Sequence, residues 1–292
     1  MSIYRQPAIW PISKLVFFDC DSTLSSIEGI DELARLSANE DDIALNIAKL
    51  TKRAMEGDIP LEAVYGQRLG VVKPNQSQVR HIAKIYRQKV IPDAPAIIKA
   101  LQTLGIKVFI ISGGLIEPVR DFGYWLGIPS ERIFAVDMEY DQLSGEWWRY
   151  WEQSGGQNPR ANYLSAGPSP LTGTGGKNRI ITQIRAEHPG RAILIGDGLS
   201  DLEAGAEVDL FIGFGGAVYR QRVLDEAAIY IHTASLAAVL PLALGRAGNS
   251  PRFAPLWAEG LRSIHAGEVS FHDSQTRIEF LAAMRRDNQS DF

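Results

Sequence analysis

Four short apolar runs recur along the chain, and small or acidic residues follow most of them. The runs predict buried strands over Leu15–Asp19, Lys107–Ser112, Arg191–Asp197 and Asp209–Ile212. The segments between the runs carry apolar residues at helical spacing, as over Ile116 to Leu126. Strands that alternate with helices predict a parallel sheet with helices on both faces, which is an α/β fold of Rossmann-like type.

A long insertion separates the first predicted strand from the second. Within it, apolar residues recur every three or four positions, at Ile43, Ile47 and Leu50 and again at Val79, Ile82 and Ile85. This spacing predicts helices. We therefore expect a core domain over 14–25 and 90–244, and a helical cap domain over 26–89 that closes over the strand ends.

Two further segments depart from the alternation of strands and helices. Residues 137–176 predict a flap within the core, with a hairpin turn at Ser144-Gly145 and a loop rich in Gly, Ser and Pro over 154–174. Residues 245–292 form a C-terminal extension of unknown role. Its first part, 245–255, is typical of a linker. Apolar residues at helical spacing then predict two short helices, packed on the core or on a second subunit.

Composition narrows the class of protein. A chain of 292 residues with 45% hydrophobic residues can bury a sizeable core. A net charge of −4 with interspersed signs gives no support for a nucleic-acid or membrane partner. The single cysteine, Cys20, cannot form an intramolecular disulfide, and the N-terminus has no long apolar stretch. We therefore expect a cytoplasmic protein, and the oligomeric state stays open.

The candidate chemistry lies where these elements begin and end. Asp19-Cys20-Asp21 follows the first strand, and Ser112-Gly113-Gly114 follows the second. Gly175-Gly176-Lys177 opens a predicted helix, and Asp197 with Asp201 follows the third strand. Glycines after a strand let backbone N–H groups approach an anion, and a helix N-terminus favours negative charge. The four segments together predict a phosphate site with paired carboxylates and a lysine.

Other kinds of phosphate or metal site fail on individual residues. A P-loop ending at Gly176-Lys177 requires glycine at position 171 and serine or threonine at 178, where Leu171 and Asn178 stand. A dinucleotide fingerprint that starts at Gly213 requires glycine where Val218 stands. The sequence has no HExxH motif and no paired CxxC motif, so zinc chemistry has no support.

The ordered set of motifs resembles the haloacid dehalogenase-like (HAD) phosphatases, and within them the phosphoserine phosphatase family of serine biosynthesis. The resemblance covers about residues 14–244. The narrower likeness rests on the segments around Glu28, Met55 and Arg68, and on Gly213–Gly216 followed by Val218 and Arg220. It implies hydrolysis of O-phospho-L-serine to serine and phosphate, with Mg²⁺ and an aspartyl-phosphate intermediate.

The resemblance also implies roles for the reacting groups. Asp19 would attack phosphorus, and Asp21 would protonate the leaving oxygen and then activate water. Lys177 would lie between Asp19 and the phosphate and balance their charge. Ser112 and the Gly113 N–H would bind the phosphate oxygens.

The resemblance also implies which residues hold the metal ion and which ones support the site. Mg²⁺ would take the side chains of Asp19 and Asp197 and the backbone carbonyl of Asp21. Asp201 would hold water, orient Lys177 or cap a helix. Thr23 would brace the loop after the first strand.

Glu28 and Arg68 would recognise the amino-acid head group of the substrate. Glu28 would take the ammonium, Arg68 would grip the carboxylate through two parallel bonds, and Met55 would form an apolar wall. Without the resemblance to the family, Arg68 is equally well explained as a solvated arginine on the surface of a helix. Two alternatives stay open: a HAD phosphatase or phosphotransferase acting on another small phosphorylated metabolite, and an inactive binding scaffold. Cys20 alternates with the two acids, so we expect a buried, inert thiol.

Overall fold

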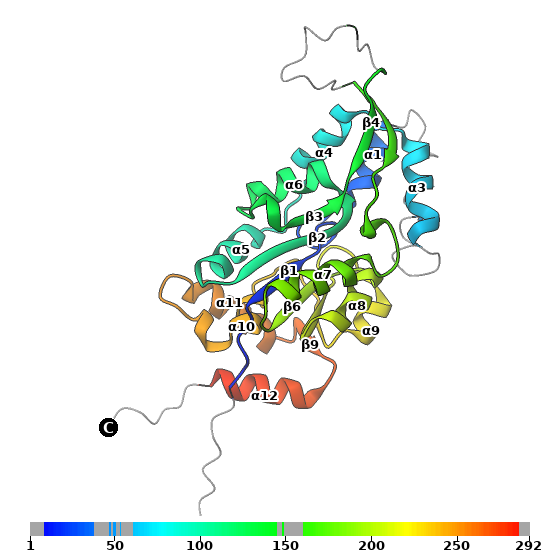
Figure 1. Ribbon diagram of the computed structural model, residues 1–292. Coiled ribbons are helices and arrows are strands. Elements are labelled where there is room, and N and C mark those ends of the chain that lie inside the picture. Colours follow the sequence, from blue (N-terminus) through cyan, green and yellow to red (C-terminus); the bar gives the residue numbers. More distant parts are fainter. Residues whose placement is uncertain are drawn as a thin grey trace, which may run out of the picture.

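The protein was analysed as a computed structural model, which describes residues 9–37, 47, 49–50, 53, 61–144, 148 and 160–285, without the side chains of 61–66. Within these residues a seven-stranded sheet has the order β3-β2-β1-β6-β7-β8-β9 (Figure 1). Neighbouring strands are parallel except β9, which pairs antiparallel with β8. Their bounds are β1 Leu15–Phe18, β2 Lys107–Leu115, β3 Ile133–Val136, β6 Ala192–Gly196, β7 Leu210–Phe214, β8 Ile229–Ile231 and β9 Val269–Phe271.

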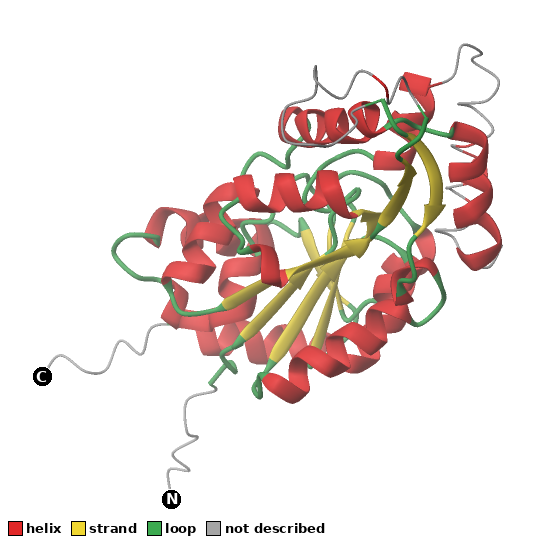
Figure 2. Cartoon of the chain, turned by 45° about the horizontal axis from the view of Figure 1, so that its top comes forward, coloured by secondary structure: helices red, strands yellow, loops and turns green. Residues whose placement is uncertain are grey.

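Strand β1 lies at the centre of this sheet, between β2 and β6. Phe18 pairs with Ile110 on one side and with Ile195 on the other. All four residues of β1 are buried because helices cover both faces, which explains the unbroken apolar run (Figure 2). The chain builds outward from β1 first through β2 and β3 and later through β6, β7 and β8. The strand order therefore reverses at β1, and such a reversal opens a crevice at the carboxyl ends of the strands.

The helices confirm the predicted α/β class. Helices α5 (Ala94–Thr103) and α6 (Ile116–Trp125) lie on one face of the sheet, and α7 (Gly176–Glu187), α8 (Leu199–Ala204) and α9 (Gln221–Glu226) lie on the other (Figure 1). Short 3-10 turns occupy Ser130–Arg132, Pro170–Thr172, Gly205–Glu207 and Gly245–Gly248. Among the described residues, no helix has the length and apolar character needed to cross a membrane.

The strand prediction is correct in position but incomplete. The sequence predicts a turn at Ser112-Gly113-Gly114, yet β2 continues through both glycines because Leu115 still pairs with Val136 of β3. The expected strand pattern misses β3, β8 and β9. Each has only three or four residues, too few for a clear apolar period.

The insertion after β1 contains helices α1 (Gly29–Ser37), α3 (Leu61–Val72) and α4 (Gln76–Gln88). Asn75 caps α4 by accepting from the Gln78 N–H, and the Gln78 side chain accepts from the Asn75 N–H. The chain enters and leaves the insertion at one place. There the Ser26 N–H donates to the Lys89 carbonyl at 2.8 Å, and the Ile91 N–H donates to the Leu24 carbonyl at 2.9 Å.

Residues within 137–176 form a separate antiparallel pair, β4 (Met138–Asp141) and β5 (Asn162–Ala166). The loop predicted over 154–174 is therefore wrong where β5 lies. This strand contacts the insertion, since the Tyr163 N–H donates to the Pro74 carbonyl and the Gln76 N–H to the Ala161 carbonyl. Figure 1 shows β4 beside α1, α3 and α4, beyond the carboxyl ends of the central strands.

The C-terminal segment follows α10 (Val239–Leu244) and contains α11 (Ala254–His265), β9 and α12 (Ser274–Met284). The two helices lie where the apolar spacing predicts them. Trp257 and Ile264 of α11 are buried. The strand between the helices adds to the main sheet, so this segment packs on the core of its own chain.

Candidate active site

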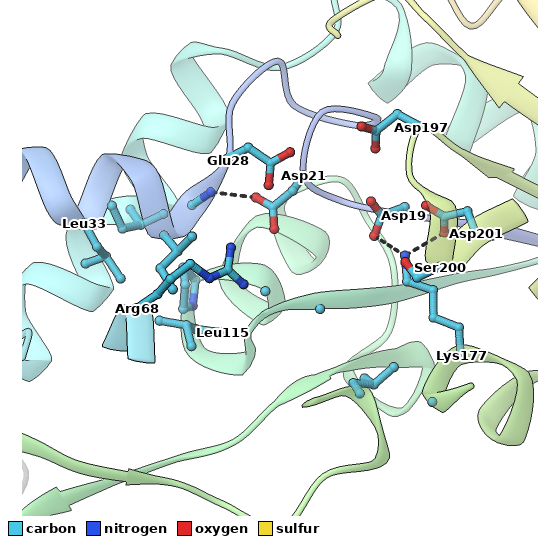
Figure 3. Close-up of a pocket in the computed structure, with 18 of the residues that line it drawn as sticks. Asp19, Asp21, Glu28, Leu33, Arg68, Leu115, Lys177, Asp197, Ser200 and Asp201 are labelled. Atoms are coloured by element: carbon cyan, nitrogen blue, oxygen red, sulfur yellow. Dashed lines mark hydrogen bonds and ion pairs between the residues drawn. The ribbon is translucent and has the colours of Figure 1, made fainter. Parts of the chain in front are cut away.

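Acidic and basic side chains that lie far apart in the sequence meet at the carboxyl ends of β1 and β6. Asp19 directly follows β1, Asp197 directly follows β6, and Lys177 is the second residue of α7. Lys177 Nζ donates to Asp19 Oδ1 at 2.8 Å and to Asp201 Oδ1 at 2.6 Å (Figure 3). All four side chains are buried.

Glycines allow this close approach. Gly175 caps α7 with a φ of 69°, a left-handed conformation that glycine adopts without strain. At Gly196 a Cβ atom would overlap the side chain of Asp201. Asp201 is held in place at its other oxygen, because Oδ2 accepts from the Gly198 N–H at 3.2 Å. Asp201 thus both orients Lys177 and satisfies the start of α8.

The loop after β1 turns sharply and reaches β6. Ser22 has a φ of 54°, which is uncommon for a residue with a side chain. Its hydroxyl donates to Glu28 Oε1 at 2.9 Å, and the Thr23 hydroxyl donates to Asp197 Oδ1 at 3.2 Å. The bracing role expected of Thr23 agrees with this bond across the site.

Asp21 is held by two donors on one oxygen. The Gly29 N–H, at the start of α1, donates to Oδ1 at 2.8 Å, and the Tyr86 hydroxyl of α4 donates to the same atom at 2.6 Å. Oδ2 lies beside Gly114, where a Cβ atom would come within 2.7 Å of it. The second oxygen therefore lies next to the segment that ends β2.

Arg220 connects the metal-site and substrate-site carboxylates that the sequence predicts. Its Nε donates to Asp197 Oδ2 at 2.9 Å, and its Nη2 donates to Glu28 Oε1 at 3.2 Å. Both known partners of Glu28 use Oε1. Among the described residues, no hydrogen bond reaches Glu28 Oε2.

The predicted substrate residues lie at the other end of the same pocket. Arg68 on α3 is 3% exposed, and its guanidinium extends into the pocket toward Asp21 and Glu28 (Figure 3). Gly113 also lines the pocket. Ser112 is fully buried, and its Oγ accepts from the Gly114 N–H at 3.0 Å. Met55 falls outside the described residues.

Burial raises the pKa of several carboxyl groups to about 7, namely Asp21, Glu28, Asp197 and Asp201. For Asp21 the neighbouring charge of Asp19 adds to the effect of burial. For Asp197 and Asp201 the cations Arg220 and Lys177 oppose it.

The surroundings raise the pKa of both Lys177 and Cys20, but for different reasons. Burial lowers the pKa of Lys177, but the charges of Asp19 and Asp201 outweigh burial and leave this pKa above its ordinary value. Lys177 is therefore a permanent cation. Cys20 is fully buried, and burial with the charge of Asp21 raises the pKa of its thiol well above the ordinary value. The expected inert thiol is thus consistent with the structure.

The donor set suits a hard cation. Carboxylate oxygens of Asp19, Asp197 and Asp201 lie within 4.8 Å of one another. Oxygen donors of this kind are those that Mg²⁺ prefers.

Arg220 and Tyr86 contact the acids of the site but carry no predicted role in the sequence. Arg220 follows the Gly213–Gly216 segment, but nothing in its spacing shows which acids it would pair with. Tyr86 carries an apolar position of a helix, so the pattern shows only that its ring is buried. The one feature of the sequence that could indicate a role is a hydroxyl group at a position where a buried apolar residue is expected, because a buried hydroxyl usually has a hydrogen-bond partner.

Comparison with known proteins agrees with this geometry. The family model of haloacid dehalogenase-like hydrolases matches residues 13–142. The phosphoserine phosphatases of Bos taurus and Homo sapiens are each 34% identical over 217 residues, which cover 74% of this chain and 88% of theirs. A phosphoserine phosphohydrolase-like protein from Francisella tularensis has the same fold, with a TM-score of 0.65 and 23% identity over 78% of this chain and 99% of its own.

The sheet is parallel around β1, its strand order reverses at β1, and acids lie at the carboxyl ends of its strands. These features define a haloacid dehalogenase-like hydrolase. Within that class, this chain belongs to the phosphoserine phosphatase family, and it is a phosphoric monoester hydrolase.

Proposed function

We propose that this protein hydrolyses O-phospho-L-serine to L-serine and phosphate. One observation carries the proposal: a single buried pocket joins a reactive end, with Asp19 and Lys177, to a recognition end, with Glu28 and Arg68. A small phosphate ester with an ammonium and a carboxylate is complementary to both ends. The relatives in Bos taurus and Homo sapiens carry the same activity in their names.

The reaction follows from the positions of the two acids at β1. Asp19 attacks phosphorus and forms an acyl phosphate, while Asp21 gives its proton to the departing serine oxygen. Asp21 then takes a proton from the water that hydrolyses the acyl phosphate. The raised pKa of Asp21, about 7, suits a group that must act as acid and then as base near neutral pH. Lys177 balances the charge of Asp19 and of the incoming phosphate.

The metal in this proposal is Mg²⁺, held by the side chains of Asp19 and Asp197 and by the backbone carbonyl of Asp21. When bound, it supplies positive charge to the phosphate oxygens during transfer. Both oxygens of Asp201 already accept hydrogen bonds, from Lys177 and from Gly198. Asp197 also accepts two hydrogen bonds, from Thr23 and from Arg220, so these bonds do not separate the two acids. The resemblance to the family assigns Asp201 to orienting Lys177 and gives the ion to Asp19, Asp197 and the Asp21 carbonyl.

Recognition of the substrate head group is assigned to the insertion. Arg68 binds the carboxylate, and Glu28 Oε2 accepts from the ammonium while Oε1 stays with Ser22 and Arg220. Ser112 and the Gly113 N–H bind the phosphate oxygens. The apolar wall assigned to Met55 stays a prediction.

A substrate panel tests the proposal. Phosphate release with Mg²⁺ is measured for phosphoserine, phosphothreonine, phosphoethanolamine and glycerol phosphate. Phosphoethanolamine keeps the ammonium and lacks the carboxylate, so it isolates the Arg68 contact. We expect kcat/KM to be highest for phosphoserine, and ¹⁸O from labelled water to appear in the released phosphate. Equal rates on all four esters would contradict the proposed substrate, and transfer of phosphate to an added alcohol in place of water would indicate a phosphotransferase.

A further inference from the structure

Tyr86 joins the helical insertion to the acid that the reaction uses. It lies in the last turns of α4, is fully buried, and donates from Oη to Asp21 Oδ1 at 2.6 Å. Its ring stacks on Phe122 of α6, with 5.4 Å between ring centroids. Helices from two parts of the chain therefore fix the phenol against the carboxyl group.

The surroundings of Asp21 make its two oxygens unequal. Oδ1 accepts from Tyr86 and from the Gly29 N–H, so a proton on that oxygen would point at two donors. Oδ2 lies beside Gly114, and both residues line the pocket. A Cβ atom at Gly29 would overlap the Tyr86 hydroxyl, so the absence of a side chain at Gly29 permits this bond.

We propose that Tyr86 is a positioning residue that holds Asp21 so that Oδ2 carries and delivers the catalytic proton. This inference rests on the proposed function for the identity of the acid. As the bond between phosphorus and the leaving oxygen breaks, the bond from Asp19 to phosphorus forms. The proton on Asp21 Oδ2 moves to the leaving oxygen, and Asp21 becomes a carboxylate. The Tyr86 bond to Oδ1 then becomes charge-assisted and stronger.

This role predicts a dependence on the leaving group that simple packing does not. A bond that strengthens as Asp21 loses its proton helps most where the leaving oxygen needs that proton. Serine and other alkyl alcohols need it, whereas p-nitrophenolate leaves without it. Loss of the phenol hydroxyl should therefore slow alkyl esters selectively.

The experiment compares Tyr86→Phe with the wild-type protein on alkyl and aryl phosphates of graded leaving-group basicity. kcat/KM is the measured quantity, because it reports the phosphoryl-transfer step even when hydrolysis of the acyl phosphate limits kcat. We expect about a tenfold loss for phosphoserine and other alkyl phosphates, and less than about a twofold loss for p-nitrophenyl phosphate. The plot of log(kcat/KM) against leaving-group basicity should become steeper.

A matched control removes a hydroxyl from another tyrosine that is partly buried. Tyr140 lies in β4, its hydroxyl donates to Met138 Sδ at 3.7 Å, and it does not line the pocket. Tyr140→Phe should leave the slope of that plot unchanged. Gly29→Ala offers a second variant if Tyr86→Phe does not fold. Tyr86 keeps its hydroxyl in this variant, but the added methyl group pushes that hydroxyl away from Asp21. Gly29→Ala should steepen the plot in the same direction.

The outcomes separate this inference from the proposed function. An equal loss on alkyl and aryl esters in Tyr86→Phe, or an unchanged slope, would overturn the positioning role. The slope is measurable on simple aryl and alkyl phosphates alone. A steeper slope with no preference for phosphoserine would therefore support Tyr86 while contradicting the proposed substrate.

Discussion

The carboxyl ends of β1 and β6 and the helical insertion hold their polar groups in different ways. At the strand ends, Lys177 bonds two carboxylates and Arg220 a third, on elements whose register is fixed by the sheet. In the insertion, Arg68 lies on α3 and Glu28 directly precedes α1, and the chain of the insertion joins the core at one crossing, near Ser26 and Lys89. This chain therefore places its reacting groups on a rigid scaffold and its selecting groups on an attached layer.

The largest effect should come from the rigid region. Asp19→Asn should lower activity on every phosphate ester by roughly 10⁴-fold or more, since an amide is neither a nucleophile nor a good metal ligand. Phosphate release from phosphoserine and p-nitrophenyl phosphate measures the loss. Asp121→Asn is the matched control, because Asp121 is an exposed partner of Arg87 and should change little. Substantial residual activity with normal Mg²⁺ binding would contradict the nucleophile assignment.

The next effect should depend on the leaving group. Asp21→Asn should lower kcat/KM for phosphoserine by roughly 10²–10⁴-fold, the range that general acids contribute. The loss on p-nitrophenyl phosphate should be smaller, because that leaving group needs no proton. Comparison of the two substrates in one variant gives the measurement, and equal losses would mean that another group is the acid.

A smaller and selective effect should come from the insertion. Arg68→Ala should lower the ratio of kcat/KM for phosphoserine to that for phosphoethanolamine by about tenfold or more, because a hydrogen bond to a charged group contributes roughly 1.5–3 kcal/mol. Arg68→Lys should recover part of it, since lysine lacks the two-pronged contact. Arg80→Ala, at an exposed position on α4, serves as control. An unchanged ratio would remove Arg68 from recognition.

The smallest effect concerns pH and metal together. Burial raises the pKa of Asp197 to about 7, above its usual value, so its contribution to stability is present at low pH and is lost as pH rises through about 7. The metal-free protein should therefore melt at a lower temperature at pH 8 than at pH 6. Mg²⁺ needs the deprotonated acids, so the rise in Tm that it causes should be larger at pH 8.

Thermal melting with and without Mg²⁺ at both pH values gives the measurement. A rise in Tm of equal size at pH 6 and pH 8 would show that protons do not compete with the ion at this site.

The sequence predicts the rigid region better than the insertion. Asp19, Asp197 and Lys177 each stand beside an apolar run or a glycine pair, so the elements that position them are visible in the pattern. Arg68 has no such neighbour, and only resemblance to a family separates it from a surface arginine. Its burial, at 3% exposure, depends on how α3 packs.

Contacts between distant elements account for what the pattern misses. The bonds of Tyr86 to Asp21 and of Arg220 to Glu28 span 65 and 192 positions of the chain. Such pairs arise from the packing of whole elements, and a local period of two or 3.6 residues does not contain them. The pairing of Asn162 in β5 with Asn75, just before α4, is absent from the local pattern for the same reason.

Strand β9 has a consequence for handling the protein. It covers the outer edge of β8, whose three residues Ile229, Tyr230 and Ile231 are buried. A protein shortened before β9 would keep every residue of the active site but would expose an apolar strand with unpaired N–H and C=O groups, which other chains can extend into aggregates. We therefore expect the C-terminal segment to govern solubility and storage of the enzyme while leaving the rate of each surviving molecule unchanged.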